Sequence, residues 1–158
     1  MVGEGGPPFH SGVALYNNDQ HWVGWNHGRN PLPFVLVEDV AEAVFLATRA
    51  EGIEGHCYNL VGDVAMNARE YTALVGEKLQ RPMRYHPQSV TWLWLEDVGK
   101  WLVKRAAGRK PMFPSRRDFL SRGMGARFDC SDAQRDLGWK PVANRERFIA
   151  RAIAVHAS

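Results

Sequence analysis

Apolar positions change their spacing within residues 31–48, and this change predicts an α/β protein. Phe34–Val37 form a short unbroken apolar run after two prolines, which is typical of a strand buried on both faces. Behind this run the apolar residues recur at helical spacing, with charged residues on the opposite side. Asp39 stands between the two patterns, where a carboxylate can cap a new helix. We therefore expect a strand, an acidic turn and an amphipathic helix at the centre of the fold.

The other segments alternate between strand-like and helix-like patterns. Short strands are expected at 21–25, 57–62, 83–86 and 126–129, and residues 11–18 form either a short helix or irregular structure. Helical spacing predicts helices over 68–80, 90–107, 132–137 and 147–157, and a helical turn over 116–123. The expected boundaries include an Asn67/Glu70 capping box, a Ser131 cap and a stop at Gly138.

These patterns predict one domain over residues 1–158, with a few short strands and four to five helices. An N-terminal loop region (1–30) precedes a strand–helix–strand unit (31–62), and a mainly helical part (63–158) follows. The chain is 45% hydrophobic and 23% charged, which is close to the average for globular proteins. Because no apolar run is long enough to span a bilayer and no signal peptide is recognisable, we expect a cytoplasmic protein. Cys57 and Cys130 are expected to be buried free thiols, although a disulfide is the alternative.

Charge is distributed unevenly along the chain. Nine basic residues and one acidic residue, Asp118, lie between Lys100 and Arg127, whereas the net charge of the whole chain is only +3. This basic band (residues 100–127) suggests a phosphate-bearing or acidic partner, and the alternative is a solvated helix end and loop. Arginine forks match phosphate oxygens, so a diphosphate-bearing ligand fits the band.

Other partners fit the pattern less well. Nucleic acid is disfavoured because no aromatic residues are interleaved with the arginines of the band. The tryptophans of the segment 90–107 could lie at a membrane interface, but a tryptophan stripe is more often part of a core, so we expect no membrane contact. The six histidines lack the spacing of a metal site, and we expect no bound metal.

Three segments, in this order, resemble the C-terminal half of the extended short-chain dehydrogenases, the NAD-dependent epimerase/dehydratase family. They are LPFVLVEDVAEA at 32–43, CYNLVG at 57–62 and RFDCSDAQRDLGWKP at 127–141. The third segment, a Phe-Asp strand followed by a capped helix and Leu-Gly-Trp-x-Pro, is the most specific. The resemblance covers nearly the whole chain and implies the substrate-binding half of a two-part enzyme, an isomerase or an oxidoreductase.

The family's cofactor half would bind NAD or NADP and supply a Tyr-x-x-x-Lys pair, and neither feature occurs here. The glycines near the N-terminus do not form the dinucleotide fingerprint. The four tyrosines are followed four positions later by residues other than lysine (Gln20, Gly62, Val75 and Ser89 after Tyr16, Tyr58, Tyr71 and Tyr85). We therefore expect no catalytic residue and no cofactor bound by this chain alone, and we expect the chain to start where the cofactor half ends.

The resemblance also implies which residues would meet the substrate. Many family members that bind sugar nucleotides carry an arginine directly before the first of these strands, where this chain has Leu32, with Arg29 and Asn30 nearby. A second diphosphate-binding arginine precedes the Phe-Asp strand, and Arg122 or Arg117 matches it. The expected substrate-binding residues are therefore Arg29, Asn30, Arg117 and Arg122. Members of the family that act on sterols or flavonoids share the same scaffold.

The resemblance leads to one functional hypothesis and one alternative. The chain is expected to bind a small molecule, such as a nucleoside-diphosphate sugar, and to be catalytically incomplete. It would pair with the missing cofactor half, or self-associate, through the exposed strands 34–37 and 57–62. The alternative is a non-enzymatic module that binds a phosphorylated ligand or a protein partner through the basic band.

Overall fold

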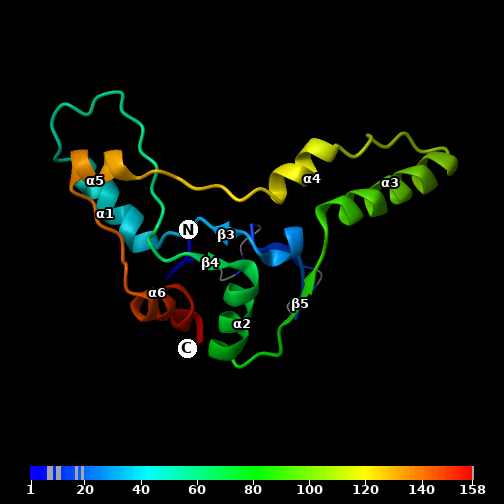
Figure 1. The fold of residues 1–158 in the computed structure, drawn as a ribbon, viewed down its shortest axis with the longest axis horizontal. Coiled ribbons are helices and arrows are strands. Elements are labelled where there is room, and N and C mark those ends of the chain that lie inside the picture. Colours follow the sequence, from blue (N-terminus) through cyan, green and yellow to red (C-terminus); the bar gives the residue numbers. More distant parts are fainter. Residues whose placement is uncertain (7–8, 10–11, 17, 19, 158) are drawn as a thin grey trace.

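The structure, a computed structural model, describes residues 1–6, 9, 12–16, 18 and 20–157, and its architecture is mixed α/β (Figure 1). Three strands form one small sheet in the order β1-β2-β5, in which β2 lies antiparallel to β1 and parallel to β5 (Ala14–Tyr16, His21–Gly24 and Arg84–Pro87). Two shorter strands, β3 and β4, pair antiparallel (Pro31–Leu32 and Met66–Asn67).

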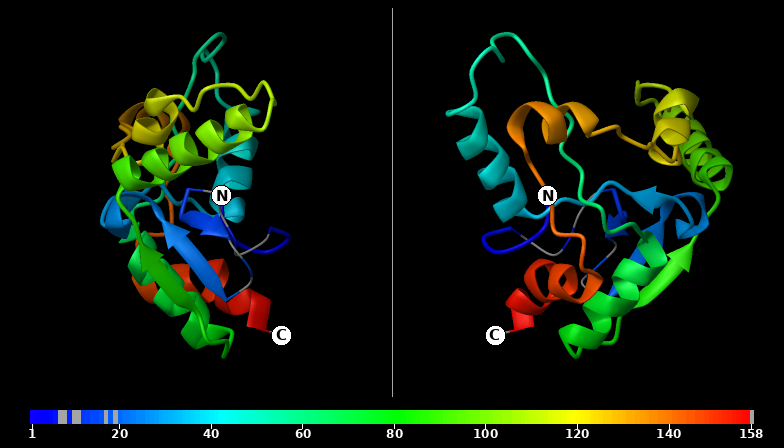
Figure 2. Two further views of the ribbon diagram at one scale, coloured as in Figure 1. Left: turned by 90° about the vertical axis from the view of Figure 1, so that its right-hand side faces the viewer. Right: turned by 60° about the vertical axis from the view of Figure 1, so that its left-hand side comes forward.

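The described residues contain six α-helices and two 3₁₀ turns, η1 and η2. The helices are α1 (Val37–Ala47), α2 (Ala68–Lys78), α3 (Val90–Ala106), α4 (Arg116–Arg122), α5 (Ser131–Leu137) and α6 (Arg145–Ala152), and the turns are Trp25–Gly28 and Ala154–Ala157. The body holds the sheets, α2 and α6, and two projections leave it on the same side, one formed by α1 and α5 and one by α3 and α4 (Figure 2). Among the described helices, none is both long and apolar enough to cross a membrane.

The expected α/β class and several boundaries are confirmed. The capping box is formed, because the Glu70 amide donates to the Asn67 side chain at 3.0 Å and the Asn67 amide donates to Glu70 at 3.1 Å. Gly138 ends α5 in the left-handed region, with φ of 65°. Strands form at 21–24 and 84–87, close to the expected positions. Each of these features is local in sequence, which explains why the pattern alone locates it.

The apolar run Phe34–Val37 is buried as expected but is not a strand. Phe34, Val35 and Leu36 are all buried, yet among the described residues the run forms only one parallel bridge, between Leu36 and Val2. Hydrogen bonds from the Val2 amide to Val35 O and from the Val37 amide to Val2 O, both 2.9 Å, make this bridge. The ladder goes no further because α1 already begins at Val37.

Asp39 does not cap α1, because the helix starts two residues earlier and Leu36 is its N-terminal cap. The Asp39 side chain is only 4% exposed. Its carboxylate accepts a hydrogen bond from the Val142 amide at 3.1 Å, and its carbonyl accepts one from the Trp139 indole at 2.8 Å. A buried carboxylate needs such partners, and here they attach the segment after α5 to the first turn of α1.

Other expected elements differ from the structure. Residues 57–62 and 126–129 are not strands, and the 1–30 region contains β1 in addition to the strand expected near residues 21–25. Residues 14–16 are a strand, whereas Ser11 and Asn17 of the expected 11–18 element lie outside the described residues. Ser131 begins α5 instead of capping it, and its amide donates to the Asp129 carboxylate at 2.9 Å. The terminal helix ends at Ala152 and continues as a 3₁₀ turn.

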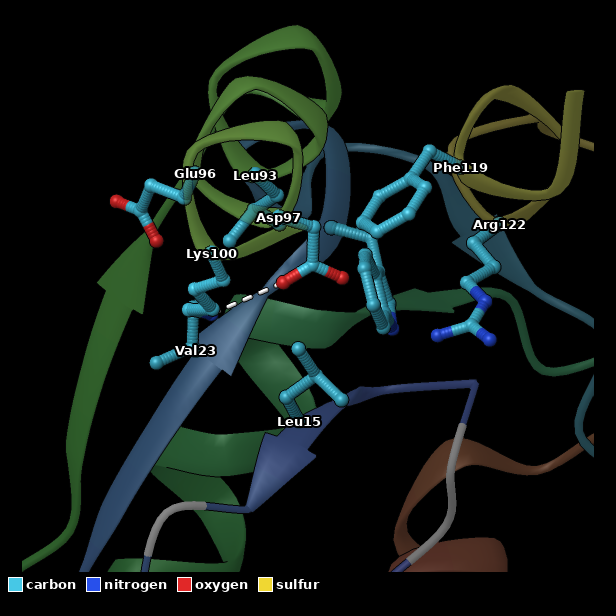
Figure 3. Close-up of a pocket in the computed structure, with 9 residues that line it drawn as sticks. Leu15, Val23, Leu93, Glu96, Asp97, Lys100, Phe119 and Arg122 are labelled. Atoms are coloured by element: carbon cyan, nitrogen blue, oxygen red, sulfur yellow. Dashed lines mark hydrogen bonds and ion pairs between the residues drawn. The ribbon is translucent and has the colours of Figure 1, made fainter. Parts of the chain in front are cut away.

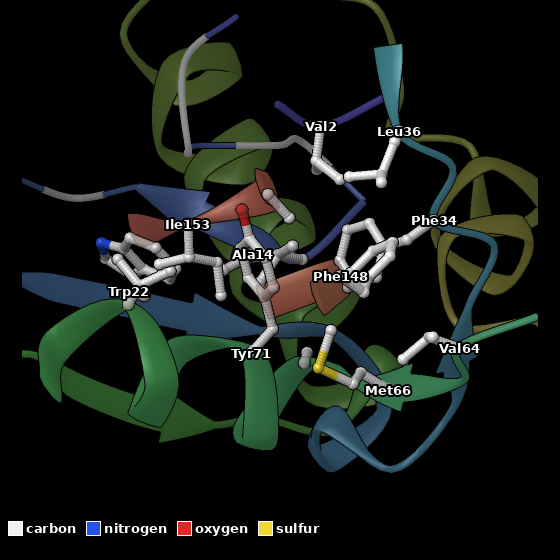
Figure 4. Close-up of a cluster of buried hydrophobic side chains, with 14 residues drawn as sticks. Val2, Ala14, Trp22, Phe34, Leu36, Val64, Met66, Tyr71, Phe148 and Ile153 are labelled. Atoms are coloured by element: carbon white, nitrogen blue, oxygen red, sulfur yellow. The ribbon is translucent and has the colours of Figure 1, made fainter. Parts of the chain in front are cut away.

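The core is divided into two clusters that match the body and the α1/α5 projection. The larger cluster joins the sheets, α2 and α6 (Figure 4), and includes Trp22, Phe34, Leu36, Met66, Tyr71, Phe148 and Ile153. The smaller cluster packs α1 against α5 and contains Val35, Ala43, Ala133, Leu137 and Trp139. Both cysteines are free, and Cys57 is exposed rather than buried. The α3/α4 projection adds nothing to either cluster, and apart from Val90 and Leu93 at the base of α3 its large apolar residues are exposed or half-buried.

The Tyr85 ring fits against two glycines, and this contact explains the path of the chain at the end of β2. A Cβ atom at Gly24 or at Gly28 would overlap the Tyr85 ring. Burial raises the pKa of Tyr85 to about 12, and its hydroxyl has no hydrogen-bond partner among the described residues. Gly28 also needs glycine because its φ is +66°.

We expect Gly24→Ala to lower the free energy of unfolding by about 1–3 kcal/mol, because the added methyl group displaces the Tyr85 ring. Chemical denaturation followed by tryptophan fluorescence measures this change. Gly99→Ala is the control, since that position in α3 faces open space and alanine favours the helix by up to about 1 kcal/mol. A Gly24→Ala variant as stable as the parent chain would contradict the packing described here.

Candidate functional site

A cleft of ≈ 520 Å³ lies where the α3/α4 projection meets the body (Figure 3). The strands β1 and β2 form its floor, and η1, α3 and α4 form its walls. The lining residues are Leu15, Val23, Trp25, Leu93, Glu96, Asp97, Lys100, Phe119 and Arg122. The cleft therefore combines an apolar floor, two aromatic rings and charged groups of both signs.

The aromatic wall holds an arginine over its surface. Trp25 is 6% exposed, and its ring meets the Phe119 ring edge-on at a centroid distance of 6.5 Å. The Arg122 guanidinium lies 5.0 Å from the centre of the Trp25 ring and 5.8 Å from that of Phe119. Such cation–π contacts orient a guanidinium and leave its N–H groups free to donate. Arg122 forms no salt bridge with any described residue, so its charge is available to a ligand.

The opposite wall carries a charged pair from α3. The Lys100 ammonium donates to the Asp97 carboxylate at 2.9 Å, and this hydrogen bond raises the pKa of Lys100. Glu96 lies beside this pair on the same wall (Figure 3). Carboxylates accept hydrogen bonds from hydroxyl groups, whereas Arg122 donates to anionic oxygens. The cleft can therefore bind a molecule that has an anionic group at one end and hydroxyl groups at the other.

A pair of amides fixes the position of Arg122. The side chains of Asn26 and Asn30 both donate to the Gly123 carbonyl, the former at 3.2 Å, and Asn26 also donates to Asn30 at 3.1 Å. We call this arrangement the amide clasp. It joins η1 to the C-terminal end of α4, so that the residue before Gly123 lies over Trp25. Gly123 is required at this point, because a Cβ atom there would press into the Val90 side chain.

The η1 turn is itself held in a left-handed conformation. Asn26 and His27 have φ values of 43° and 58°, which non-glycine residues adopt only when their surroundings hold them there. The His27 amide donates to Gln88 O at 3.0 Å, and Arg69 donates to His27 O at 2.7 Å. These hydrogen bonds connect the η1 turn to the residues before α3 and to α2, and so fix the position of the turn that carries Asn26.

Two of the four expected substrate-binding residues come together at this site. Arg122 lines the cleft, and Asn30 positions it through the clasp rather than facing a ligand, since its amide oxygen and nitrogen are both engaged. Arg29 and Arg117 are exposed and do not line the cleft. Arg117 follows the first residue of α4, on a different face of the helix from Arg122.

The sequence prediction missed most of the wall residues. Trp25 ends a segment predicted as a strand, and no sequence signal marks it as a ligand-facing ring. Lys100 was counted in the basic band, but its pairing with Asp97 follows only from the i,i+3 spacing on α3. Aromatic residues are not interleaved with the arginines of the basic band in sequence, but in the structure Arg105 lies over the Trp101 ring and Arg116 lies over the Trp94 ring.

A smaller cleft of ≈ 300 Å³ lies beside Leu32, the position at which the resemblance implies an arginine in many family members. Leu32 and Arg127 both line it, together with Pro31, Pro33, Val61, Gly62, Ala65, Ala126 and Phe128. Leu32 is apolar, and Arg127 is the only basic residue among those that line this cleft. This cleft has mostly apolar walls and one charge.

A polar cluster attaches the 56–58 segment to α5. Tyr58 donates to the Asp136 carboxylate at 3.1 Å, and Arg135 donates to the same carboxylate at 2.8 Å. The hydrogen bond from Arg135 lowers the pKa of Asp136, whereas desolvation and the bond to Asp136 raise the pKa of Tyr58. The His56 imidazole lies 3.5 Å from Asp136. Because Asp136 is ionised and fully engaged, the cluster acts as a structural contact.

We expect this contact to stabilise the fold above the ordinary aspartate pKa of about 3.9. The folded-state pKa of Asp136 is lowered, so the contribution is lost as the pH falls from that value through the folded-state pKa. Acid unfolding followed by circular dichroism should show a weaker pH dependence between about pH 5 and pH 3 in Asp136→Asn than in the parent chain. Equal pH dependence in the two proteins would contradict the assignment.

The N-terminal glycines form a turn, in which the Gly6 amide donates to Gly3 O at 3.2 Å. Within the described part of the chain, no group of three or more histidine, cysteine or acidic side chains could hold a metal ion. In comparisons with known proteins, no family model matches the chain, and no curated protein or solved structure matches it either.

Proposed function

We propose that this chain is the substrate-binding part of an NAD(P)-dependent epimerase, dehydratase or reductase. Its substrate would be a nucleoside-diphosphate sugar or a related small molecule with an anionic group. The cofactor and the Tyr-x-x-x-Lys pair would come from a separate half, since this chain contains neither motif. The proposal rests on the order of the three motif segments and on the chemistry of the cleft.

One observation carries the proposal: the amide clasp places Arg122 over Trp25 at the mouth of a cleft. The resemblance by itself would bring the region just before residue 32 and the arginine before residue 127 to one substrate site. Asn30 and Arg122 are 92 positions apart in sequence, yet Asn30 bonds to the residue next to Arg122. This meeting supports the proposal independently of the motifs.

The chemistry of the lining residues agrees with such a substrate. The free donors of Arg122 suit diphosphate oxygens, and the Phe119 ring, which stands edge-on to the buried Trp25 ring, offers an apolar surface to a base or a sugar ring. Asp97 and Glu96 can accept hydrogen bonds from sugar hydroxyls, while Lys100 balances one of their charges. The apolar floor of Leu15 and Val23 completes a site in which a few polar groups orient a ligand.

Arg122→Gln should weaken the binding of a UDP-sugar by about 10- to 100-fold, because a charge-assisted hydrogen bond contributes about 1.5–3 kcal/mol. Isothermal titration calorimetry with UDP-glucose and UDP-glucuronate measures the change in Kd. Arg117→Gln is the matched control, since it removes the same charge from the same helix outside the cleft. Its Kd should stay within about twofold of the parent value.

If the two variants lose affinity equally, α4 contributes only its overall charge to binding, and the assignment of the cleft as the substrate site is wrong. A second titration with short oligonucleotides at two salt concentrations tests the alternative of a charge-driven module. Steep salt dependence with oligonucleotides and no saturable binding of UDP-sugars would favour that alternative.

We expect the isolated chain to show no NAD(P)-dependent turnover. Hydride transfer requires a bound nicotinamide and a nearby acid or base, and the chain has no recognisable site for either. Absorbance of NADH and NADPH, monitored with UDP-sugars that the chain binds, provides the measurement. Turnover by the purified chain that scales with its concentration would contradict the division of labour proposed here.

A further inference from the structure

The far end of the α3/α4 projection has an unusual surface. We call residues 100–117 the arm tip; they comprise the second half of α3, the connecting segment 107–115 and the start of α4. The arm tip reaches from the cleft, which Lys100 lines, to the edge of the molecule, and it lies away from the α1/α5 projection (Figures 1 and 2). Neither core cluster includes any of its residues.

The arm tip carries charge of one sign only. It contains seven basic residues and no acidic residue, and all seven basic side chains are exposed (Lys100, Lys104, Arg105, Arg109, Lys110, Arg116 and Arg117). The nearest acidic residues in sequence are Asp97, which pairs with Lys100, and Asp118. Six basic side chains of the arm tip therefore form no salt bridge with any described residue. Such a surface attracts anionic partners.

Large apolar side chains are exposed among these charges. Met112 is 93% exposed and Val103 is 71% exposed, and Leu102 and Phe113 are each more than half exposed. An exposed group of large apolar residues is uncommon on the surface of a globular protein and marks a contact site. The expectation that the tryptophan stripe of this helix belongs to the core is wrong, because neither core cluster includes a residue of α3 and Trp92 is 55% exposed.

Two indole groups hold the connecting segment in place. Trp101 donates to the Pro111 carbonyl and Trp94 donates to the Pro114 carbonyl, both at 3.0 Å. The Trp101 ring also meets the Phe113 ring edge-on at 5.2 Å. The segment between the two prolines is thus folded back along α3, and Met112 at its centre points to solvent. The exposed apolar residues are consequently a fixed feature of the arm tip.

We propose that the arm tip docks on the surface of a membrane that contains anionic phospholipids. Lys and Arg side chains would contact the headgroups, and Met112 and Phe113 would enter the boundary between headgroups and acyl chains. Charge of one sign matches an anionic bilayer, which offers no fixed positions for acidic partners. A projecting tip, unlike a groove, can enter a lipid surface without rearrangement. This proposal replaces the sequence-based expectation of no membrane contact and does not depend on the proposed substrate.

Sedimentation of the 158-residue chain with vesicles tests the proposal. One set of vesicles contains phosphatidylcholine only, and the other contains about a third phosphatidylserine, which gives a strongly negative surface. We expect binding to the anionic vesicles that weakens as salt is added, and little binding to the neutral ones. Equal binding to both sets, or none to either, would overturn the proposal.

Two variants and their matched controls identify the surface. Arg109→Gln with Lys110→Gln should weaken vesicle binding on the order of 20-fold, since each basic side chain near an anionic surface contributes a similar share of the binding free energy. Arg145→Gln with Arg147→Gln removes two exposed charges from α6 and should leave binding within about threefold.

Met112→Ser with Phe113→Ser should weaken binding by about tenfold or more, because insertion of their apolar area is lost. Val44→Ser with Phe45→Ser, two exposed apolar residues on α1, is the control and should bind as the parent does. Circular dichroism confirms that each variant is folded. If a variant and its matched control lose binding equally, the proposal is overturned. Sedimentation velocity without vesicles measures self-association, and an arm tip that self-associates but does not bind vesicles would also overturn it.

Discussion

The amide clasp is the constraint on which the candidate site depends. Asn26 and Asn30 donate to a single carbonyl, that of Gly123, and so connect the end of β2 with the end of α4. The α3/α4 projection contributes no residue to either core cluster, and its base is anchored by Val90, Leu93 and this clasp. Without it, Arg122 would have no fixed relation to Trp25, and the cleft would lose one wall.

A second polar attachment holds the other projection. Asp39 accepts hydrogen bonds from Trp139 and Val142 through its carbonyl and its carboxylate, and so fixes the chain after α5 to the first turn of α1. The apolar packing of Trp139 against Val35 and Ala43 surrounds these bonds. Both projections are therefore positioned by buried or half-buried polar groups with specific partners. Burying such groups costs little free energy only when each of them is hydrogen-bonded.

Local signals in the sequence predict the local parts of the structure. The Asn67/Glu70 capping box and the Gly138 stop depend on residues within one turn, and both form as expected. The Phe34–Val37 run shows the limit of such signals. Its composition indicates burial, and the run is buried, but a strand also needs a partner ladder, and Val2 supplies only one bridge. The role of Asp39 was misjudged because its partners lie about a hundred positions away.

The candidate site was predictable in part. The resemblance indicates Asn30 and Arg122, and the structure brings them together, although Asn30 positions the arginine instead of facing a ligand. Trp25 and Asp97 were not predictable, because a tryptophan at the end of a strand and an acid on a helix carry no functional signal without their neighbours. The exposure of Met112 and Phe113 was hidden for the same reason, since apolar residues in sequence suggest a core.

A double-mutant cycle tests most directly whether the clasp acts through Arg122. UDP-glucose binding would be measured by calorimetry for the parent chain, Asn30→Ala, Arg122→Gln and the double variant. The account predicts that Asn30→Ala weakens binding by about tenfold in the parent chain but changes it little in the Arg122→Gln variant. The reason is that Asn30 affects binding only through the position of Arg122. Losses that simply add, or an Asn30→Ala variant that binds as tightly as the parent, would contradict it.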